Sequence, residues 1–411
     1  MTVRSASFLL AAALLLAVGR PAASAQDPAP ELVLVGGTVL DVRAGTLAPA
    51  NVVVGGGRIL AVGPDDPPAG VETLDVSGRF VLPGLLDAHT HASRLSEVRR
   101  ALESGVTTLR SASVGSYQDV AIGRMVAEGH LDGPDYLGAG IFVTPNIGEG
   151  RVASESLYGV SDNLQDEADL RQLVRVNAEN GVRAVKTRAT ERAGLPDTDP
   201  RRQVFTEAQL RAIVEEASAL GLPVLCHAHG DEGARAAVLA GVASIEHGTF
   251  LTRETLELMK ERGTALVPTY TTLIDLHEPG GDYDHPVLKL RADFMVPRLE
   301  ETIHMARELG VRVIAGSDTG YGPESVSRVG VEVTNFVKLG YSPIEAIRSA
   351  TIYTAELLRV DADTGAIEVG KEADLIVLAE NPLVRIEAIQ DVVAVVSNGR
   401  LAVNRLPFSI E

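Results

Sequence analysis

Histidines are concentrated in three short segments of this chain, each directly after an apolar run. Of nine histidines, His89 and His91 occur in LLDAHTH, His227 and His229 in VLCHAHG, and His247 in SIEHG. Residues two apart on a strand point to the same side, so His89 and His91 can reach one metal ion from a single strand end. Any one of these histidines could instead be a hydrogen-bonded core residue. Because neutral imidazole is the commonest metal-binding side chain, the set as a whole predicts a metal site.

Two other ionisable residues follow apolar runs, Lys186 in VRAVK and Asp318 in VIAGSD. Burying a free ammonium is costly, so Lys186 either extends its charge to solvent or to an ion pair, or is a neutral amine carbamylated by CO₂. Asp318 can ligate a metal and accept a proton from water, or it can cap the next helix. Four imidazoles, one bridging carboxylate and one further carboxylate are about the inventory that a two-metal hydrolytic site needs.

Such distant residues need a scaffold that brings their segments together. In the middle of the chain, apolar runs alternate with longer amphipathic segments, which is typical of parallel strands separated by helices. Barrel enzymes place their active sites at the carboxyl ends of the strands, where these polar residues occur. The pattern therefore predicts an α/β fold with a (β/α)8 TIM barrel over residues 83–365. Its eight expected strands lie at 85–89, 106–110, 136–141, 182–187, 223–227, 243–247, 265–269 and 311–316.

Both ends of the chain have a different pattern. Short β-branched runs broken by Gly and Asn occupy 31–62, 373–378 and 391–403, and Asn398-Gly399 is a strong hairpin turn signal. We expect residues 26–82 and 366–411 to form one small composite β-sandwich domain. Within the barrel, Thr206 and Ser342 each begin a capping box and so mark helix starts.

The first 25 residues resemble a secretory signal peptide, with Arg4, an apolar run at 8–18 and Ala23-Ser24-Ala25 before the expected cut. An uncleaved membrane anchor is the alternative. We expect a periplasmic or secreted protein with no stable membrane insertion after cleavage. The net charge of −18, without a Lys/Arg cluster, argues against nucleic acid as a partner. A single cysteine, Cys226, excludes an internal disulfide.

The order of these motifs resembles the amidohydrolase superfamily in its binuclear-metal form. HxH follows strand one, Lys follows strand four, His follows strands five and six, and Asp follows strand eight. VLPGLLDAHTH and KEADLIVLAENPL resemble the family's entry into the barrel and its exit. The segment CHAHGDEGARAAVLAGVASIEHG resembles the branch that contains imidazolonepropionase-like enzymes, Xaa-Pro dipeptidases and ochratoxin-hydrolysing amidases.

The resemblance implies two divalent metal ions, which we expect to be Zn²⁺. It places one ion on His89, His91 and Asp318, the second on His227 and His247, and carbamylated Lys186 between them. It also implies that the ions activate a hydroxide for attack on the substrate, while Asp318 serves as general base and then as general acid. In this branch we expect His227, 20 residues before His247, to be the strand-five ligand, with His229 lining the substrate site. His229 as the ligand remains the alternative.

Residues on the substrate side are less strongly indicated. His229 and Tyr270 are candidate donors to the oxyanion, and Arg110 and Arg188 are candidate partners of a substrate carboxylate, although surface ion pairs would explain both arginines equally well. Two loops depart from the family pattern. Residues 145–150 read PNIGEG where relatives often have a GGHG-like segment, and residues 187–192 read TRATER where smaller residues are expected.

The sequence therefore predicts a hydrolase that cleaves an amide or peptide C–N bond, in dipeptides of the Xaa-Pro type or in N-acyl amino acids. Its expected partners are a small-molecule or dipeptide substrate and, as an open alternative, further copies of itself. A lactonase or esterase, or a cyclic-amide hydrolase like imidazolonepropionase, is the alternative activity. A non-catalytic metal-binding scaffold is the remote alternative, because such proteins usually lose ligands and all six positions are filled here.

Overall fold

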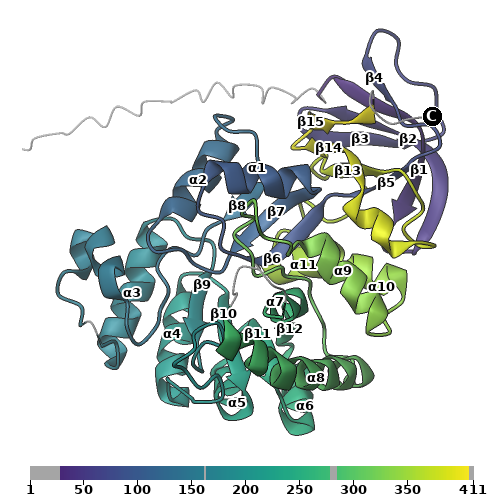
Figure 1. Ribbon diagram of the computed structural model, residues 1–411. Coiled ribbons are helices and arrows are strands. Elements are labelled where there is room, and N and C mark those ends of the chain that lie inside the picture. The colour runs from purple at the N-terminus through teal and green to yellow at the C-terminus, as the bar shows by residue number, and fades with distance from the viewer. Residues whose placement is uncertain (1–27, 162, 278–284, 407–411) are drawn as a thin grey trace, which may run out of the picture.

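The computed structural model of this 411-residue chain describes residues 28–161, 163–277 and 285–406. The predicted signal peptide at 1–25 lies outside the described residues. Two parts are evident, a small β-domain formed by both ends of the chain and a larger body of strands and helices between them (Figure 1). Among the described helices, none has both the length and the apolar composition needed to cross a bilayer.

The β-domain is one sheet to which both ends of the chain contribute. Its strand order is β15-β14-β13-β5-β1-β2-β3, and β4 pairs with β1. The central strand β5 is parallel to β1 and antiparallel to β13, so it joins the two ends of the chain. Asn398 and Gly399, both with positive φ, form the predicted turn between the last two strands. The bounds are β1 Leu32–Asp41, β2 Thr46–Gly55, β3 Arg58–Gly63, β4 Glu72–Asp75, β5 Phe80–Pro83, β13 Leu375–Leu378, β14 Val392–Ser397 and β15 Arg400–Asn404.

Within the described residues, the larger body has seven parallel strands in two groups, β6-β7-β8 and β9-β10-β11-β12. They are β6 Leu85–Thr90, β7 Val106–Ser111, β8 Asp135–Leu137, β9 Val185–Arg188, β10 Val224–Gly230, β11 Ser244–Phe250 and β12 Ala265–Val267. The α-helices are α1 Leu95–Glu103, α2 Gln118–Ala127, α3 Glu167–Glu179, α4 Glu207–Ala219, α5 Asp231–Ala240, α6 Arg253–Arg262, α7 Tyr270–Asp275, α8 Pro286–Leu309, α9 Val329–Lys338, α10 Pro343–Ser349 and α11 Ile352–Leu358. Short 3₁₀ helices are η1 Gly148–Ala153, η2 Glu155–Leu157 and η3 Ile386–Gln390.

The eighth expected strand, 311–316, is extended but pairs too briefly to count as a strand. On one side Ile314 N–H donates to Leu266 of β12, and on the other Ala88 N–H of β6 donates to Ala315. Ala315 N–H, however, donates to Ser349 at the end of α10 instead of to a strand. The segment therefore closes the ring between β12 and β6, although α10 takes part of its hydrogen bonding. Together with the β-domain, this confirms the predicted fold class.

The third expected strand, 136–141, is also shorter than predicted. The N–H groups of Ala139 and Gly140 donate to the carboxylate of Asp119 on α2, so they are withdrawn from the strand ladder. Further along the chain, Val143 N–H donates to the Lys186 carbonyl and restores contact with β9. A side chain that takes over backbone donors is the physical reason that this strand ends early.

Both predicted capping boxes are present. The Thr206 and Ser342 hydroxyls each accept a hydrogen bond from the backbone N–H of the third residue of α4 and α10. In turn, the side chains of Gln209 and Glu345 accept the backbone N–H of Thr206 and Ser342. These caps fix where the two helices begin and so how the preceding loops approach the barrel.

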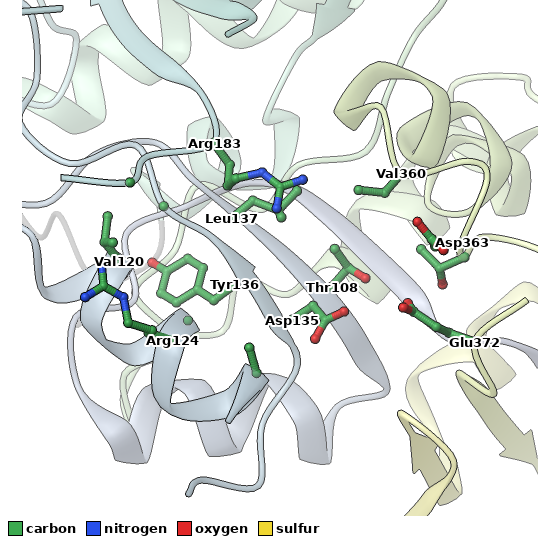
Figure 2. Close-up of a pocket in the computed structure, with 15 residues that line it drawn as sticks. Thr108, Val120, Arg124, Asp135, Tyr136, Leu137, Arg183, Val360, Asp363 and Glu372 are labelled. Carbon is green, nitrogen blue, oxygen red and sulfur yellow. The ribbon is translucent and has the colours of Figure 1, made fainter. Parts of the chain in front are cut away.

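A cavity of about 330 Å³ lies where β7 and β8 meet the segment that leads into the β-domain. Asp135, Asp363 and Glu372 gather on one side of it (Figure 2). The Asp374 carboxylate, on which the charges of Asp135 and Glu372 act, accepts Asn398 N–H at 2.9 Å and the Thr364 hydroxyl at 2.8 Å. Burial, reinforced by the charge of Asp135, raises the pKa of Asp374 to about 7.

Asp374→Asn should change how stability depends on pH. The raised pKa means that wild-type Asp374 contributes fully to stability below the unfolded pKa of about 3.9 and loses that contribution as pH rises through about 7. The asparagine variant has no charge to bury, so its melting temperature relative to wild type should increase between pH 4.5 and pH 8.5. Thermal unfolding across this range measures the difference, with Asp66→Asn at an exposed position as control. A difference that stays constant with pH would contradict this account.

Candidate metal centre

The six predicted ligand residues meet at the carboxyl end of the barrel. They come from the ends of β6, β9, β10 and β11 and from the loop after the closing segment 311–316. Together with His229 they line one cavity of about 60 Å³. The residues brought together are His89, His91, Lys186, His227, His247 and Asp318.

A buried carboxylate fixes the first histidine. His89 Nδ1 lies 2.6 Å from Glu246 Oε2, and Arg110 Nη2 lies 3.1 Å from Glu246 Oε1. Burial alone would raise the pKa of Glu246, but the Arg110 charge and the His89 hydrogen bond lower it to about 2. The ionised carboxylate therefore accepts a hydrogen bond from His89 Nδ1–H and leaves Nε2 free for a metal, as in carboxylate–histidine–metal arrangements.

The other imidazoles are oriented in the same way, each through one ring nitrogen. Nδ1 is the tethered atom in His91, His229 and His247, whereas Nε2 is tethered in His227. The partners are the Ser113 carbonyl for His91 at 2.7 Å, Thr249 Oγ1 for His229 at 2.8 Å, Thr269 Oγ1 for His247 at 2.7 Å and the Glu191 carbonyl for His227 at 2.9 Å. In each ring the second nitrogen remains as a donor atom for a cation.

Three of these rings are held uncharged by their surroundings. Burial lowers the pKa of His227 and His247 well below the usual value, and it lowers the pKa of His229 to about 3. An imidazole must be neutral to offer a lone pair. The site is therefore able to bind cations without first losing protons from these three side chains.

Asp318 supplies a carboxylate that lies beside the rings of His89, His91 and His247. Its Oδ1 lies 3.4 Å from His89 Nε2 and 3.2 Å from His91 Nε2, and its Oδ2 lies 3.9 Å from His247 Nδ1. Although burial opposes ionisation, the charge and hydrogen bond of His89, with a further bond from His91, keep the pKa of Asp318 well below the usual value. Asp318 and His247 both have positive φ, 47° and 73°, a strained conformation for residues with side chains.

The donor atoms form two groups within which they lie no more than 4.8 Å apart. One consists of His227, His229 and His247, and the other of His89, His247 and Asp318. The shared His247 ring stacks on His229 with centroids 4.7 Å apart and lies 4.5 Å from His227. Neutral imidazoles and an ionised carboxylate, in two adjoining groups, fit a pair of divalent cations. Both His227 and His229 remain available as the ligand from β10.

Lys186 is buried at the end of β9, with only 2% of its surface exposed. Its Nζ lies 5.7 Å from the centroid of the Phe142 ring. Burial lowers the pKa of Lys186 to about 8. A larger fraction of the amine is therefore neutral at neutral pH than for a lysine in water, and neutral amine is the form that reacts with CO₂.

Two predicted substrate residues, Arg110 and Tyr270, do not line the metal cavity. Arg110 is buried. Its Nη2 donates to Glu246 and its Nε donates to the Ala88 carbonyl at 2.6 Å, so its guanidinium group is bound inside the barrel. The Tyr270 hydroxyl lies 2.5 Å from Glu300 of α8 and does not line the metal cavity. Both predicted roles are therefore corrected, and His229 remains as the candidate oxyanion donor that lines the cavity.

Arg188 lines a second cavity of about 510 Å³ that adjoins the first. Arg192 lines both cavities and was not singled out from the sequence, although it belongs to the unusually charged TRATER segment. Glu246 was also missed, even though it directly precedes His247 in the sequence. In both cases, the sequence feature that could have indicated the residue is a charged side chain close to a predicted ligand.

Asp87, likewise not predicted, ties β6 to the closing segment. Its Oδ1 accepts the N–H groups of His89 at 3.1 Å and Ser317 at 3.0 Å, and its Oδ2 accepts the Tyr321 hydroxyl at 2.7 Å. Because Ser317 precedes Asp318, this fully buried carboxylate holds ligand residues from two distant segments in register.

Comparisons with known proteins support a common architecture. A model of the Amidohydrolase family matches residues 80–402. Ochratoxinase from Aspergillus niger is 28% identical over 359 residues, which cover 77% of this chain and 73% of that protein. Imidazolonepropionase from Rubrobacter xylanophilus is 28% identical over 391 residues, which cover 80% of this chain and 85% of that protein. The crystal structure of a Xaa-Pro dipeptidase with methionine in its active site has a TM-score of 0.82 and 27% identity, covering 90% of this chain and 99% of that one.

Glu246→Gln should weaken metal binding without removing any proposed ligand. The neutral amide holds His89 Nδ1 less strongly and leaves Arg110 without its charge partner, so we expect metal affinity to fall about 10- to 100-fold. Competition between the protein and a Zn²⁺ chelator, well below the unfolding temperature, measures the affinity. Glu207→Gln on the exposed side of α4 is the control. Unchanged affinity in Glu246→Gln would show that His89 needs no support from Glu246.

Proposed function

Because this chain belongs to the amidohydrolase family, we propose that it is an exported hydrolase that cleaves an amide C–N bond in dipeptides or N-acyl amino acids. The observation that carries the proposal is the convergence of oriented imidazoles, Lys186 and Asp318 in one small cavity at the carboxyl end of the barrel. The names of two similar proteins, a Xaa-Pro dipeptidase and an ochratoxinase, support an amide-type substrate. Export rests on the signal-like residues 1–25.

We assign the proposed ligands as the family pattern and the donor atoms suggest. His89, His91 and Asp318 would hold one ion, and His227 and His247 the other. Zn²⁺ is the proposed metal because imidazole and carboxylate donors suit it. When bound, the ions would polarise the scissile carbonyl and lower the pKa of a water molecule towards about 7.

Lys186 is proposed to bridge the two ions as a carbamate. Its neutral amine nitrogen adds to CO₂ and loses one proton, which gives a carboxylate-like group at the end of the side chain. The burial of Lys186, which lowers the pKa of its amine to about 8, supports this role. A free ammonium would have to remain charged in the same buried position, which is costly.

Asp318 is the proposed proton carrier. Its carboxylate is ionised and faces the cavity, so it can accept a proton from the attacking water. It can then give this proton to the leaving nitrogen, acting first as general base and then as general acid. His89 Nε2 and His91 Nε2 lie beside Oδ1, at 3.4 and 3.2 Å, so Oδ2 remains for this transfer.

His229 is the proposed donor to the oxyanion. If its Nδ1 accepts a hydrogen bond from the Thr249 hydroxyl, Nε2 carries the ring proton and can donate to the substrate. The low pKa of His229 keeps the ring neutral, so this N–H is a neutral donor held in place before the reaction.

A substrate panel tests the function. Metal-loaded enzyme should hydrolyse Xaa-Pro or Xaa-Phe dipeptides or N-acyl amino acids, lose this activity when a chelator removes the metal, and regain it with Zn²⁺. Mass spectrometry of the products identifies the bond that breaks. Hydrolysis of lactones alone would instead indicate the alternative esterase function, and a metal-free protein after purification and reconstitution would contradict the proposal.

Lys186→Ala should remove the bridging carboxylate. We expect activity to fall at least ~100-fold, with partial recovery when formate or acetate is added, because a small carboxylate can occupy the space left by the side chain. Metal content, measured by elemental analysis, should fall with activity. Lys260→Ala, at an exposed position on α6, is the matched control. Full activity in Lys186→Ala would rule out the carbamate.

A further inference from the structure

One arginine of α8 holds the loop that borders the metal cavity. This loop covers residues 191–202, between β9 and α4, and Glu191 N–H closes it by donating to the Arg202 carbonyl. The Arg291 guanidinium group donates four hydrogen bonds into the loop, all of them to backbone carbonyls. The acceptors are the carbonyls of Ala193 at 2.5 Å, Leu195 at 2.7 Å, Pro196 at 3.2 Å and Thr198 at 2.7 Å. Most of the donor capacity of one side chain is therefore directed at a single loop.

These bonds compensate for an arrangement that is unfavourable for the loop alone. Carbonyl oxygens gathered around one point repel one another, and a partly buried carbonyl without a donor is unfavourable. A guanidinium ion relieves both effects, because it is positively charged and its N–H groups form a rigid planar fork. The loop adds bonds of its own, from the Thr198 hydroxyl to the carbonyls of Arg192 and Leu195. Its shape therefore depends on a side chain that belongs to a different element of the fold.

The loop meets the metal cavity in two ways. Residues 192–194 form part of the lining of the cavity. In addition, the Glu191 carbonyl oxygen lies 2.9 Å from His227 Nε2 and accepts a hydrogen bond from it. Arg291 itself does not line the cavity, so its influence on the site passes through the loop.

The bond to Glu191 decides which nitrogen of His227 a cation can use. Because a carbonyl oxygen only accepts, Nε2 of His227 carries the ring proton and the lone pair stays on Nδ1. In His89 and His247 the tethered atom is Nδ1 instead. His227 therefore needs a ring orientation of its own, and the Glu191 carbonyl supplies the contact that fixes it.

Resting on the proposed metal centre, we propose that Arg291 is a positioning residue for the second metal ion, the one assigned to His227 and His247. By fixing the 191–202 loop, Arg291 places the Glu191 carbonyl where it orients His227. The same bonds hold the part of the loop that forms a wall of the cavity.

The first ion of the proposed pair has a different support. Glu246 on β11 orients His89, and the Ser113 carbonyl orients His91. Neither contact involves the 191–202 loop. Removal of the Arg291 side chain therefore weakens one metal site and spares the other, which a general loss of stability would not do.

The test compares Zn²⁺ binding by wild type, Arg291→Ala and the matched control Arg298→Ala. Arg298 lies on the same helix, but it donates to the Phe294 carbonyl of α8 itself. Titration of metal-free protein against a chelator gives the affinity for each ion. In Arg291→Ala we expect one affinity to fall about 10- to 100-fold, as when a group that supports a metal ligand is removed. The other affinity should match that of wild type and of Arg298→Ala.

Chemical rescue shows whether the lost hydrogen bonds are responsible. Guanidinium chloride, well below the concentration that unfolds the protein, supplies a cation that fits the space left by the Arg291 side chain. It should restore the weakened affinity in Arg291→Ala and leave wild type and Arg298→Ala unchanged. If Arg291→Ala does not fold, Arg291→Lys replaces it, because lysine keeps the charge without the planar fork. A smaller loss at the same single ion is then the expected result.

Hydrogen exchange reports on the loop without any metal. Peptide amides from residues 191–202 should exchange faster in metal-free Arg291→Ala than in metal-free wild type, as measured by mass spectrometry. Unchanged exchange, two unchanged affinities, or an equal loss of affinity for both ions would each overturn the inference.

These measurements need no substrate, so they are separate from the test of the proposed function. If one ion depends on Arg291 but metal-loaded wild type cleaves no amide, the proposed function fails and the role of Arg291 stands. If wild type cleaves amides and Arg291→Ala binds both ions as wild type does, the role of Arg291 fails and the hydrolase function stands.

Discussion

A charged chain of three buried side chains, Arg110, Glu246 and His89, underlies the whole centre. Arg110 stabilises the Glu246 carboxylate, and that carboxylate fixes the tautomer and orientation of His89. Such a buried ion pair is favourable only when both partners are present with good geometry. The barrel therefore supplies three strands, β6 and β7 from one group and β11 from the other, that must be placed correctly before a metal ligand is oriented. Folding of the barrel and assembly of the site are thus one event.

Backbone strain is concentrated around the same cavity. His247, Thr269 and Asp318 all have positive φ. His247 lies within β11, Thr269 directly precedes α7, and Asp318 follows the closing segment. Such conformations persist only where surrounding contacts determine them. Here the hydrogen bonds of Asp87 to Ser317 and Tyr321 fix the closing segment, and the Thr269 hydroxyl contacts His247. The strained residues are thus held by bonds that also orient the ligands.

The sequence was sufficient to predict the fold class, because strand periodicity and the order of the polar strand ends are local patterns. It predicted less well where tertiary contacts decide the direction of a side chain. Arg110 lies one residue before the end of β7 and bonds the Ala88 carbonyl, so it points into the barrel and not to its mouth. Tyr270 begins α7, and the turn at Thr269 directs its hydroxyl towards Glu300. The positions of Glu246 and Arg192 at the site depend on contacts with residues that are distant in sequence, so the sequence alone did not indicate them.

The sheet that joins the chain ends has a consequence for biogenesis. Strand β5 pairs with β1 on one side and with β13 on the other, and β13 is among the last segments to be synthesised. While the polypeptide emerges from a ribosome or a translocation channel, one edge of β5 has no partner, and open edges invite aggregation. The sheet can therefore be completed only after β13 has been synthesised, so the nascent chain stays incompletely folded until its synthesis is nearly finished.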